Sequence, residues 1–186
     1  MGSVEERVCD SEQVKSLIAT MARVLWETRR PELPLSLIGV RSRGVPLAQR
    51  LAQELRPVSD QEILVGAVDI TLYRDDLGER RRWPVLRGTE IPFRVDGAEI
   101  VLVDDVLFTG RTIRAALNAV CDLGRPSRMR LAVLVDRGHR EFPIQPDVVG
   151  LHLPTDRRDR VRVRLHPFDP IDEITRVDHG CSPSAP

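Results

Sequence analysis

The sequence feature that most constrains the fold is a strand–turn–helix unit in the second half of the chain. The strand-like run 99–103, EIVLV, is followed directly by Asp104 and Asp105. Apolar residues then recur at helical spacing over residues 112–123, and Gly124 is placed to end that helix. A buried strand that leads through a short turn into an amphipathic helix is the repeating unit of parallel α/β sheets.

The rest of the chain continues this alternation of helices and strands. Apolar spacing predicts one helix over residues 12–28, capped by Asp10, and another that follows Gly44, with Pro46 in its first turn. Short apolar runs predict strands over residues 35–40, 63–72, 100–103, 131–135, 147–153 and 161–165. We therefore expect an α/β fold, with a central, mostly parallel sheet flanked by helices, in a single domain over residues 1–177. The polar, proline-bearing tail 178–186 is expected to be disordered.

Composition and charge exclude several classes of protein. Of the 186 residues, 41% are hydrophobic and 30% are charged, which is typical of a soluble globular domain. No apolar run approaches the roughly 20 residues that span a bilayer, and the N-terminus lacks a secretory signal, so a cytoplasmic location is expected. The net charge of zero argues against a protein that simply coats a polyanion.

The three cysteines are far apart and odd in number, which indicates neither a disulfide framework nor a zinc site. Cys121 falls on the apolar face of the predicted helix over residues 112–123. We therefore expect its side chain in the core.

The turn after the acid pair has the features of a phosphate site. Thr109, Gly110, Arg111 and Thr112 lead into the helix, where unpaired backbone N–H groups and the helix dipole favour an anion. Gly110 allows the backbone to approach closely, and the threonine hydroxyls add donors. Two adjacent carboxylates beside such a site are reasonable if they accept hydrogen bonds from sugar hydroxyls, or if a divalent cation lies nearby.

Two other polar segments are less specific. Arg41, Ser42, Arg43 and Gly44 follow a predicted strand and open a predicted helix, but a basic surface loop is the commoner interpretation of such a stretch alone. The segment 73–88, YRDDLGERRRWPVLRG, is dense in charge and longer than most connections. Its composition is compatible with a solvated hairpin and equally with a mobile lid over an active site.

The long motif after the central strand resembles the 5-phosphoribosyl-1-pyrophosphate (PRPP) signature of type I phosphoribosyltransferases. Its residues are Val101, Leu102, Val103, Asp104, Asp105, Val106, Leu107, Phe108, Thr109, Gly110, Arg111, Thr112 and Ile113. Three further stretches narrow the resemblance, namely residues 69–77, 123–144 with VDRGHRE, and 153–156. Together they are similar to the PyrR family of bifunctional pyrimidine operon attenuation regulators and uracil phosphoribosyltransferases. The similarity covers roughly residues 10–165.

The resemblance implies a type I phosphoribosyltransferase fold with a small hood and a flexible lid, and it implies roles for residues. Asp104 and Asp105 would hold the ribose 2- and 3-hydroxyls, and residues 109–112 would hold the 5-phosphate. The binding set for PRPP or UMP comprises Arg41, Ser42, Arg43 and Gly44, which form the pyrophosphate loop, and every residue from Asp104 through Val106, Leu107 and Phe108 to Thr112. Val135, Asp136 and Arg137 would border the base pocket. The candidate catalytic residues are Asp105, Arg43 and Arg74, the last in the segment that matches the family's lid.

The activity implied by the resemblance is the reaction of uracil with PRPP to give UMP and pyrophosphate, with Mg²⁺ carried by PRPP. The family's second role is UMP-dependent binding of an mRNA stem–loop of the pyrimidine operon, with UTP as a further ligand and a homodimer, or a higher assembly, as the unit. No membrane partner is implied.

The chain departs from the family where RNA binding is concerned. The family usually has Gly-Lys-Asn before its Pro-Thr, whereas this chain has Gly150, Leu151 and His152. Arginines 157, 158, 160, 162 and 164 could compensate, or they could lie on an exposed strand. Alternative hypotheses are therefore a uracil phosphoribosyltransferase without RNA regulation, an RNA regulator with weak catalysis, and an enzyme for another base. His139 could contact a ligand or cap a turn.

Overall fold

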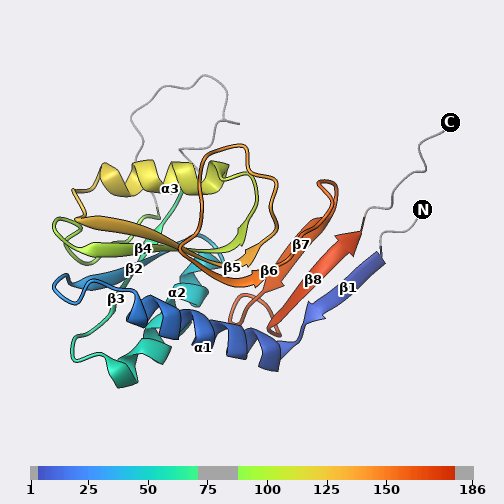
Figure 1. Cartoon of the computed structure of the whole chain (residues 1–186), viewed down its shortest axis with the longest axis horizontal. Helices are drawn as coiled ribbons and strands as arrows, with labels where there is room; N and C mark the ends of the chain where they lie inside the picture. Colours follow the sequence, from blue (N-terminus) through green and yellow to red (C-terminus); the bar gives the residue numbers. More distant parts are fainter. Residues whose placement is uncertain (1–3, 71–87, 179–186) are drawn as a thin grey trace.

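A computed structural model describes residues 4–70 and 88–178, which form two β-sheets and three α-helices (Figure 1). The larger sheet is parallel and has the strand order β3-β2-β4-β5-β6. Its strands are β2 (Leu35–Val40), β3 (Leu64–Val68), β4 (Glu99–Leu107), β5 (Arg128–Asp136) and β6 (Val148–His152). The predicted α/β class and parallel central sheet are confirmed.

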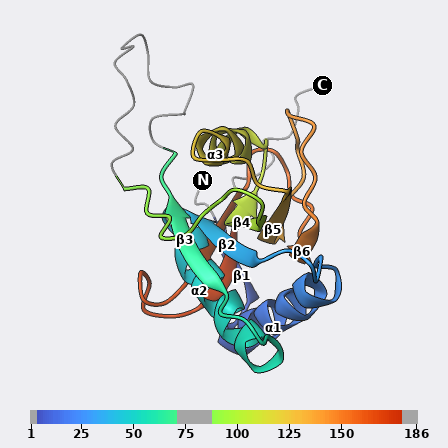
Figure 2. The ribbon, with the colours of Figure 1, turned by 90° about the vertical axis from the view of Figure 1, so that its left-hand side faces the viewer.

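Helices cover both faces of this sheet (Figure 2). The helices α1 (Ser11–Glu27) and α2 (Gly44–Leu55) lie on one face, and α3 (Arg111–Cys121) lies on the other. A short 3-10 helix, Arg56–Val58, extends α2. Two clusters of buried apolar side chains result, one between the sheet and α1 and α2, and one between the sheet and α3. Every residue of β2 is buried, as expected for the middle of a sheet covered on both sides.

The helix boundaries follow local chemistry that the sequence displays. Asp10 caps α1, since its carboxylate accepts the N–H of Gln13 at 3.0 Å while the Gln13 side chain accepts the N–H of Asp10 at 2.9 Å. The apolar positions Val14, Ile18 and Met21 then face the core. Within the described residues, no helix is both long and apolar enough to cross a membrane.

A second, antiparallel sheet joins the two ends of the described chain. It has the order β1-β8-β7, with β1 spanning Val4–Cys9, β7 Arg160–Arg164 and β8 Glu173–Asp178. No apolar run predicts β1 or β8, because charged residues interrupt both strands. Glu5, for example, accepts the Thr175 hydroxyl at 2.8 Å and Arg164 Nη2 at 3.0 Å. Asp178 belongs to β8, so its assignment to a disordered tail is wrong, and residues 179–186 lie outside the described structure.

Two other expectations need correction. Cys121 is exposed at the last turn of α3, because the apolar face of that helix turns away from it there. β4 and β5 are also longer than predicted, and β4 runs through both aspartates to Leu107.

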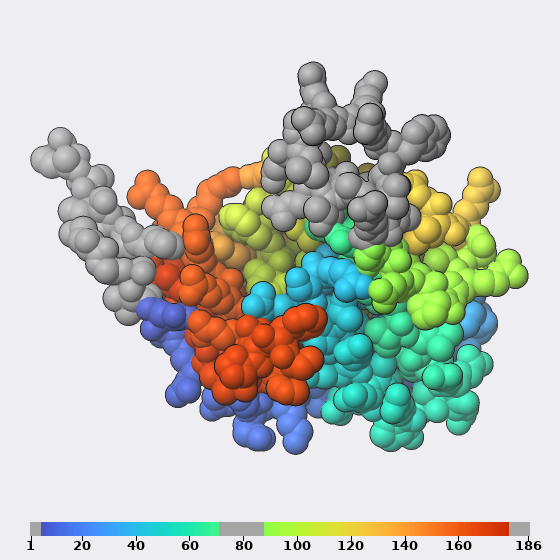
Figure 3. Space-filling model, turned by 180° about the vertical axis from the view of Figure 1, so that it is seen from behind, coloured from blue at the N-terminus to red at the C-terminus, as the bar shows by residue number. Residues whose placement is uncertain are grey.

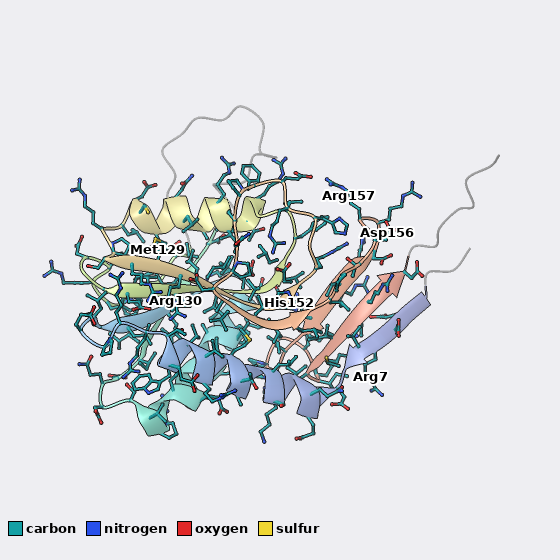
Figure 4. The ribbon with its side chains drawn as sticks, in the orientation of Figure 1. Arg7, Met129, Arg130, His152, Asp156 and Arg157 are labelled. Atoms are coloured by element: carbon teal, nitrogen blue, oxygen red, sulfur yellow. The ribbon has the colours of Figure 1, made fainter. Side chains whose placement is uncertain are left out.

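At the opposite end of this sheet, Arg130 forms a buried ion pair with Glu99 at 3.2 Å and donates to the Leu25 carbonyl near the end of α1 (Figure 4). That pair links the amino-terminal ends of β4 and β5 to the end of α1.

Candidate active site

A pocket of about 480 Å³ lies where the carboxyl ends of β2, β3 and β4 meet. Open α/β sheets bind ligands at this edge. The lining residues are Arg41, Ser42, Asp69, Ile70, Asp104, Asp105, Val106 and Thr112. Segments that are far apart in the sequence, the Arg41–Gly44 turn and the acid pair, are therefore brought together as expected.

The acid pair lies within β4 rather than after it. Asp104 pairs with Val133 of β5 in the ladder, and the residue is 6% exposed. The N–H of Asp105 donates to Asp104 Oδ1 at 3.0 Å. Burial raises the pKa of Asp104 well above its ordinary value, and the adjacent Asp105 carboxylate raises it further. Burial also raises the pKa of Asp105, and the positive charge of Arg43 offsets part of this rise.

The turn that follows has the expected geometry of an anion-binding helix start. Gly110 precedes α3 with φ +91°, a left-handed conformation that glycine adopts without strain. A Cβ at Gly110 would lie 3.4 Å from both Phe142 and Ile144, so this turn is also packed against a neighbouring loop. Thr112, in the first turn of α3, lines the pocket, and N–H groups at the start of a helix have no acceptor within that helix.

The neighbouring loop, residues 137–144 between β5 and β6, is bound tightly to the turn of residues 109–112, the candidate phosphate turn, called the phosphate turn below. Figure 1 shows it as the orange segment that rises beside the start of α3. The carbonyl of Thr109 accepts the N–H groups of Glu141 and Phe142 at 2.9 and 3.1 Å, and Arg111 pairs with Glu141 at 2.8 Å. Arg140 Nη1 donates to the Phe108 carbonyl at 2.8 Å.

Arg140 and Glu141 were missed as functional positions by sequence reasoning. They stand in the VDRGHRE stretch, so the signal was present, but their partners lie about 30 residues away and no spacing rule predicts them. Their role is to hold the phosphate turn in shape.

The predicted base-pocket residues lie at the end of β5 with different surroundings. Val135 is fully buried in the core, whereas Asp136 is partly exposed and pairs with Arg140 at 2.7 Å. Arg137 is 6% exposed, lies over the Phe108 ring at 4.2 Å and donates to Thr155 Oγ1 at 3.1 Å. Burial lowers the pKa of the Arg137 guanidinium.

His139 lies in the same loop with φ +62°, and its Nε2 is 2.7 Å from the Thr155 carbonyl oxygen. Its ring also meets the Phe108 ring edge-on, with the two ring centroids 5.8 Å apart. These contacts favour the turn-stabilising interpretation of His139 over direct ligand contact.

The Arg41–Gly44 turn borders the pocket from the β2 side. Arg41 Nε donates to the Gly88 carbonyl at 2.5 Å, and the Arg41–Ser42 peptide bond is cis. Arg43 points instead toward Asp169, with which it forms two hydrogen bonds of 3.0 Å. A Cβ at Gly44 would lie 2.3 Å from the Val103 carbonyl oxygen, so Gly44 lets α2 pack on β4. Arg74 and residues 73–87 of the expected lid lie outside the described residues.

The sequence of the chain matches known proteins over most of its length. The model of the phosphoribosyl transferase domain matches residues 6–162. The Bifunctional protein PyrR of Roseiflexus sp. is 49% identical over 89% of this chain and 90% of its own length, and that of Elusimicrobium minutum is 46% identical over 92% and 96%. The chain belongs to the PyrR family of phosphoribosyltransferases.

Solved structures agree on the fold. The hypoxanthine phosphoribosyltransferase of Trypanosoma cruzi superposes with a TM-score of 0.71 at 17% identity, over 93% of this chain and 95% of that one. The type I phosphoribosyltransferase fold of this PyrR family member is therefore confirmed.

The arginine-rich stretch of this PyrR family member is mostly paired. Arg157 contacts Glu141, Arg162 lies 3.8 Å from Glu5, and Arg164 contacts both Glu5 and Glu173. Arg158 and Arg160 are exposed. Figure 4 shows Arg157 and Asp156 on the connection from β6 to β7, above the antiparallel sheet. Ion pairing reduces the net charge that this surface can offer to RNA.

Proposed function

We propose that the chain transfers the 5-phosphoribosyl group of PRPP to uracil, giving UMP and pyrophosphate. The observation that carries this proposal is one pocket lined by the Asp104–Asp105 pair, the first turn of α3 and the Arg41–Ser42 turn. A ribose carrying a 5-phosphate and a 1-pyrophosphate needs those three kinds of group at once.

The carboxylates of Asp104 and Asp105 would accept hydrogen bonds from the ribose 2- and 3-hydroxyls. Thr109, Gly110 and Thr112 would bind the 5-phosphate at the start of α3. As the bond from C1 to the pyrophosphate oxygen breaks, positive charge develops on the ribose ring, and a uracil nitrogen attacks C1. An ionised carboxylate of this pair, held in a fixed position, would stabilise this charge without reorganisation.

Mg²⁺ fits this pocket as a partner of the substrate. Among residues 4–70 and 88–178 there is no group of three or more His, Cys, Asp or Glu side chains that could hold a metal. Oxygen donors suit Mg²⁺, and this ion commonly binds through one or two carboxylates plus substrate phosphates. The cation would neutralise the leaving pyrophosphate, while Asp104 and Asp105 border the ribose hydroxyls.

Uracil would bind at the end of β5, where backbone groups of Val135 and Asp136 are the candidates for its polar edge. Arg137 is held by Thr155 and Phe108, so its part would be to shape the wall of the pocket. The segment 73–88, with Arg74, would close over the bound substrates and exclude water.

The direct test is the double variant Asp104→Asn/Asp105→Asn, with Asp60→Asn on the exposed surface as its control. We expect UMP synthesis from uracil and PRPP to be abolished in the double variant and retained in the control. Circular dichroism should show both to be folded. Near wild-type turnover in the folded double variant would overturn the ribose assignment.

A second role, UMP-dependent binding of a pyrimidine operon mRNA stem–loop, is proposed for the same chain, acting in the cytoplasm as a homodimer or a larger assembly. The curated relatives are named bifunctional, and Arg158 and Arg160 remain exposed for phosphate contacts. A gel-shift titration with the operon leader RNA, with and without UMP, tests it. Absence of a UMP-dependent shift at low salt would contradict the RNA-binding role and leave only the enzymatic role.

A further inference from the structure

The loop of residues 165–172, between β7 and β8, connects the antiparallel sheet to the Arg41–Gly44 turn, called the pyrophosphate turn below. Its sequence, LHPFDPID, carries two aspartates three residues apart. Figure 3 shows the orange-red atoms of this part of the chain lying against the cyan and blue atoms of the N-terminal half. The loop therefore reaches the side of α2 from a sheet that contributes no lining to the pocket.

Asp169 holds Arg43 with a defined geometry. Arg43 Nε and Nη2 donate to the two carboxylate oxygens of Asp169, each at 3.0 Å. The Asp169 side chain is only 14% exposed and also accepts the N–H of Leu165 at 3.0 Å. A bidentate pair with a pre-oriented carboxylate fixes the plane of a guanidinium as well as its position.

Arg43 lies between two carboxylates. The hydrogen bonds with Asp169 raise the pKa of Arg43, and the charge of Asp105 raises it as well, whereas Arg164 opposes them. Asp105 lines the pocket, so the guanidinium is within electrostatic reach of the bound ribose. The other charged groups that line this side of the pocket are Arg41, Asp69 and Asp104.

Asp172 provides a matched contact on the same loop. Its carboxylate accepts Arg50 Nη1 at 2.5 Å and Nη2 at 2.8 Å, and it also accepts the N–H of His166 at 2.9 Å. Arg50 is about two helical turns beyond Arg43 along α2. The Asp172 pair therefore fixes the same loop to the same helix, but away from the pyrophosphate turn.

We propose that Asp169 is a positioning residue for PRPP binding, which holds Arg43 beside Asp105 and keeps the Arg41–Gly44 turn in the shape that binds pyrophosphate. This inference rests on the proposed function. It requires that ligands with a pyrophosphate group depend on Asp169 and that ligands without one do not.

The test compares Asp169→Ala with Asp172→Ala in the full-length protein. In Asp169→Ala we expect the KM for PRPP, and the KM for pyrophosphate in the reverse reaction, to rise on the order of tenfold, the effect of one weakened charge-assisted contact. The KM for uracil and the Kd for UMP should stay within about twofold, since neither ligand carries pyrophosphate. Asp172→Ala should leave all four constants near wild type, and Asp169→Glu should recover part of the loss.

A double-mutant cycle adds a second criterion. Arg43→Gln combined with Asp169→Ala should raise the KM for PRPP no further than Arg43→Gln alone, because Asp169 acts through Arg43. Equal losses for UMP and PRPP, equal effects of Asp172→Ala, or additive effects in the cycle would each overturn the proposal.

Failure of the proposed function would be recognised separately. If the wild-type protein made no UMP from uracil, calorimetric titration of wild type and Asp169→Ala with PRPP and Mg²⁺ would still test the positioning. Weaker PRPP binding in the variant alone would support it, and equal binding would contradict it.

Discussion

Asp104 and Asp105 are two carboxylates that the fold holds in an unfavourable environment before any substrate arrives. Burial raises the pKa of both groups, and the charge of Asp105 raises the pKa of Asp104 further. Under the proposed function, such a pair would gain favourable partners when ribose hydroxyls and a cation enter the pocket. Binding groups that are held in place at a cost to stability are a common feature of active sites.

This cost gives a testable pH dependence for Asp104→Asn. A carboxyl whose pKa is raised in the folded protein stabilises the fold below its unfolded pKa, about 3.9, and loses that contribution as the pH rises through the folded value. The amide variant should therefore melt higher than wild type at pH 7, by roughly 2–4 °C if about 1 kcal/mol is recovered. Near pH 3.5 the difference should disappear.

Thermal unfolding followed by circular dichroism at the two pH values measures this effect. Asp60→Asn, on the exposed surface, is the control and should melt like wild type at both. An Asp104→Asn variant that melts below wild type at pH 7 would mean that the carboxylate has a stabilising partner in the ligand-free protein.

The acid pair, the phosphate turn and the pyrophosphate turn could be located from the sequence because each follows an apolar strand in a recognisable pattern. The direction in which their side chains point could not be predicted from the sequence. Arg43 was expected to face pyrophosphate, yet it pairs with Asp169, which is 126 residues away in the chain. Sequence spacing carries no information about a contact of that range.

Among the helices and strands, those with apolar periodicity were predicted well and those without it were not. The helix expected over residues 12–28 spans Ser11–Glu27, and the strand expected over 35–40 spans Leu35–Val40. β4 was expected to stop before its aspartates, but ladder pairing with β5 continues through Leu107. β1 was not predicted because charged residues interrupt it; one of them, Glu5, has hydrogen-bond partners on β8 and β7.

The start of α2 supplies a prediction about helix–sheet packing. A Cβ at Gly44 would lie 2.3 Å from the Val103 carbonyl oxygen, so Gly44→Ala must push α2 away from β4. We expect a loss of about 1–3 kcal/mol in the free energy of unfolding, as for other overpacked sites. PRPP binding should weaken too, because the displaced helix begins at the pyrophosphate turn.

Urea denaturation compares this variant with Gly97→Asn. Gly97, unlike Gly44, has a positive φ, +75°, but a Cβ there would meet nothing within 4 Å, and asparagine tolerates that conformation. The control should unfold near wild type. Equal stability of Gly44→Ala and wild type would show that the helix relaxes without cost.

Across the whole molecule, the large sheet carries the ligand pocket while the antiparallel sheet braces it from the side. The phosphate turn is held by the loop of residues 137–144, and the pyrophosphate turn by the loop of residues 165–172. Neither of these loop contacts can be predicted from the periodicity of apolar residues. The family resemblance located the first stretch, and only the folded chain reveals the second.

The distribution of arginine over the surface bears on the RNA-binding role. Arg157, Arg162 and Arg164 pair with carboxylates of the chain, so Arg158 and Arg160 are the exposed arginines of that stretch outside these ion pairs. If RNA binds there, Arg158→Ala/Arg160→Ala should weaken it and lower the slope of log K against log salt by about two. UMP synthesis should be unchanged. An identical salt slope in a filter-binding assay would place RNA on another surface.

The most direct measurement is nucleotide formation from PRPP and Mg²⁺ with a panel of bases: uracil, cytosine, hypoxanthine, guanine and orotate. We expect UMP from uracil, with kcat/KM for each other base at least about 100-fold lower, since unpaired polar groups in a base pocket are costly. Efficient formation of a purine nucleotide or of orotidylate, with no UMP, would contradict the assignment of this site to uracil.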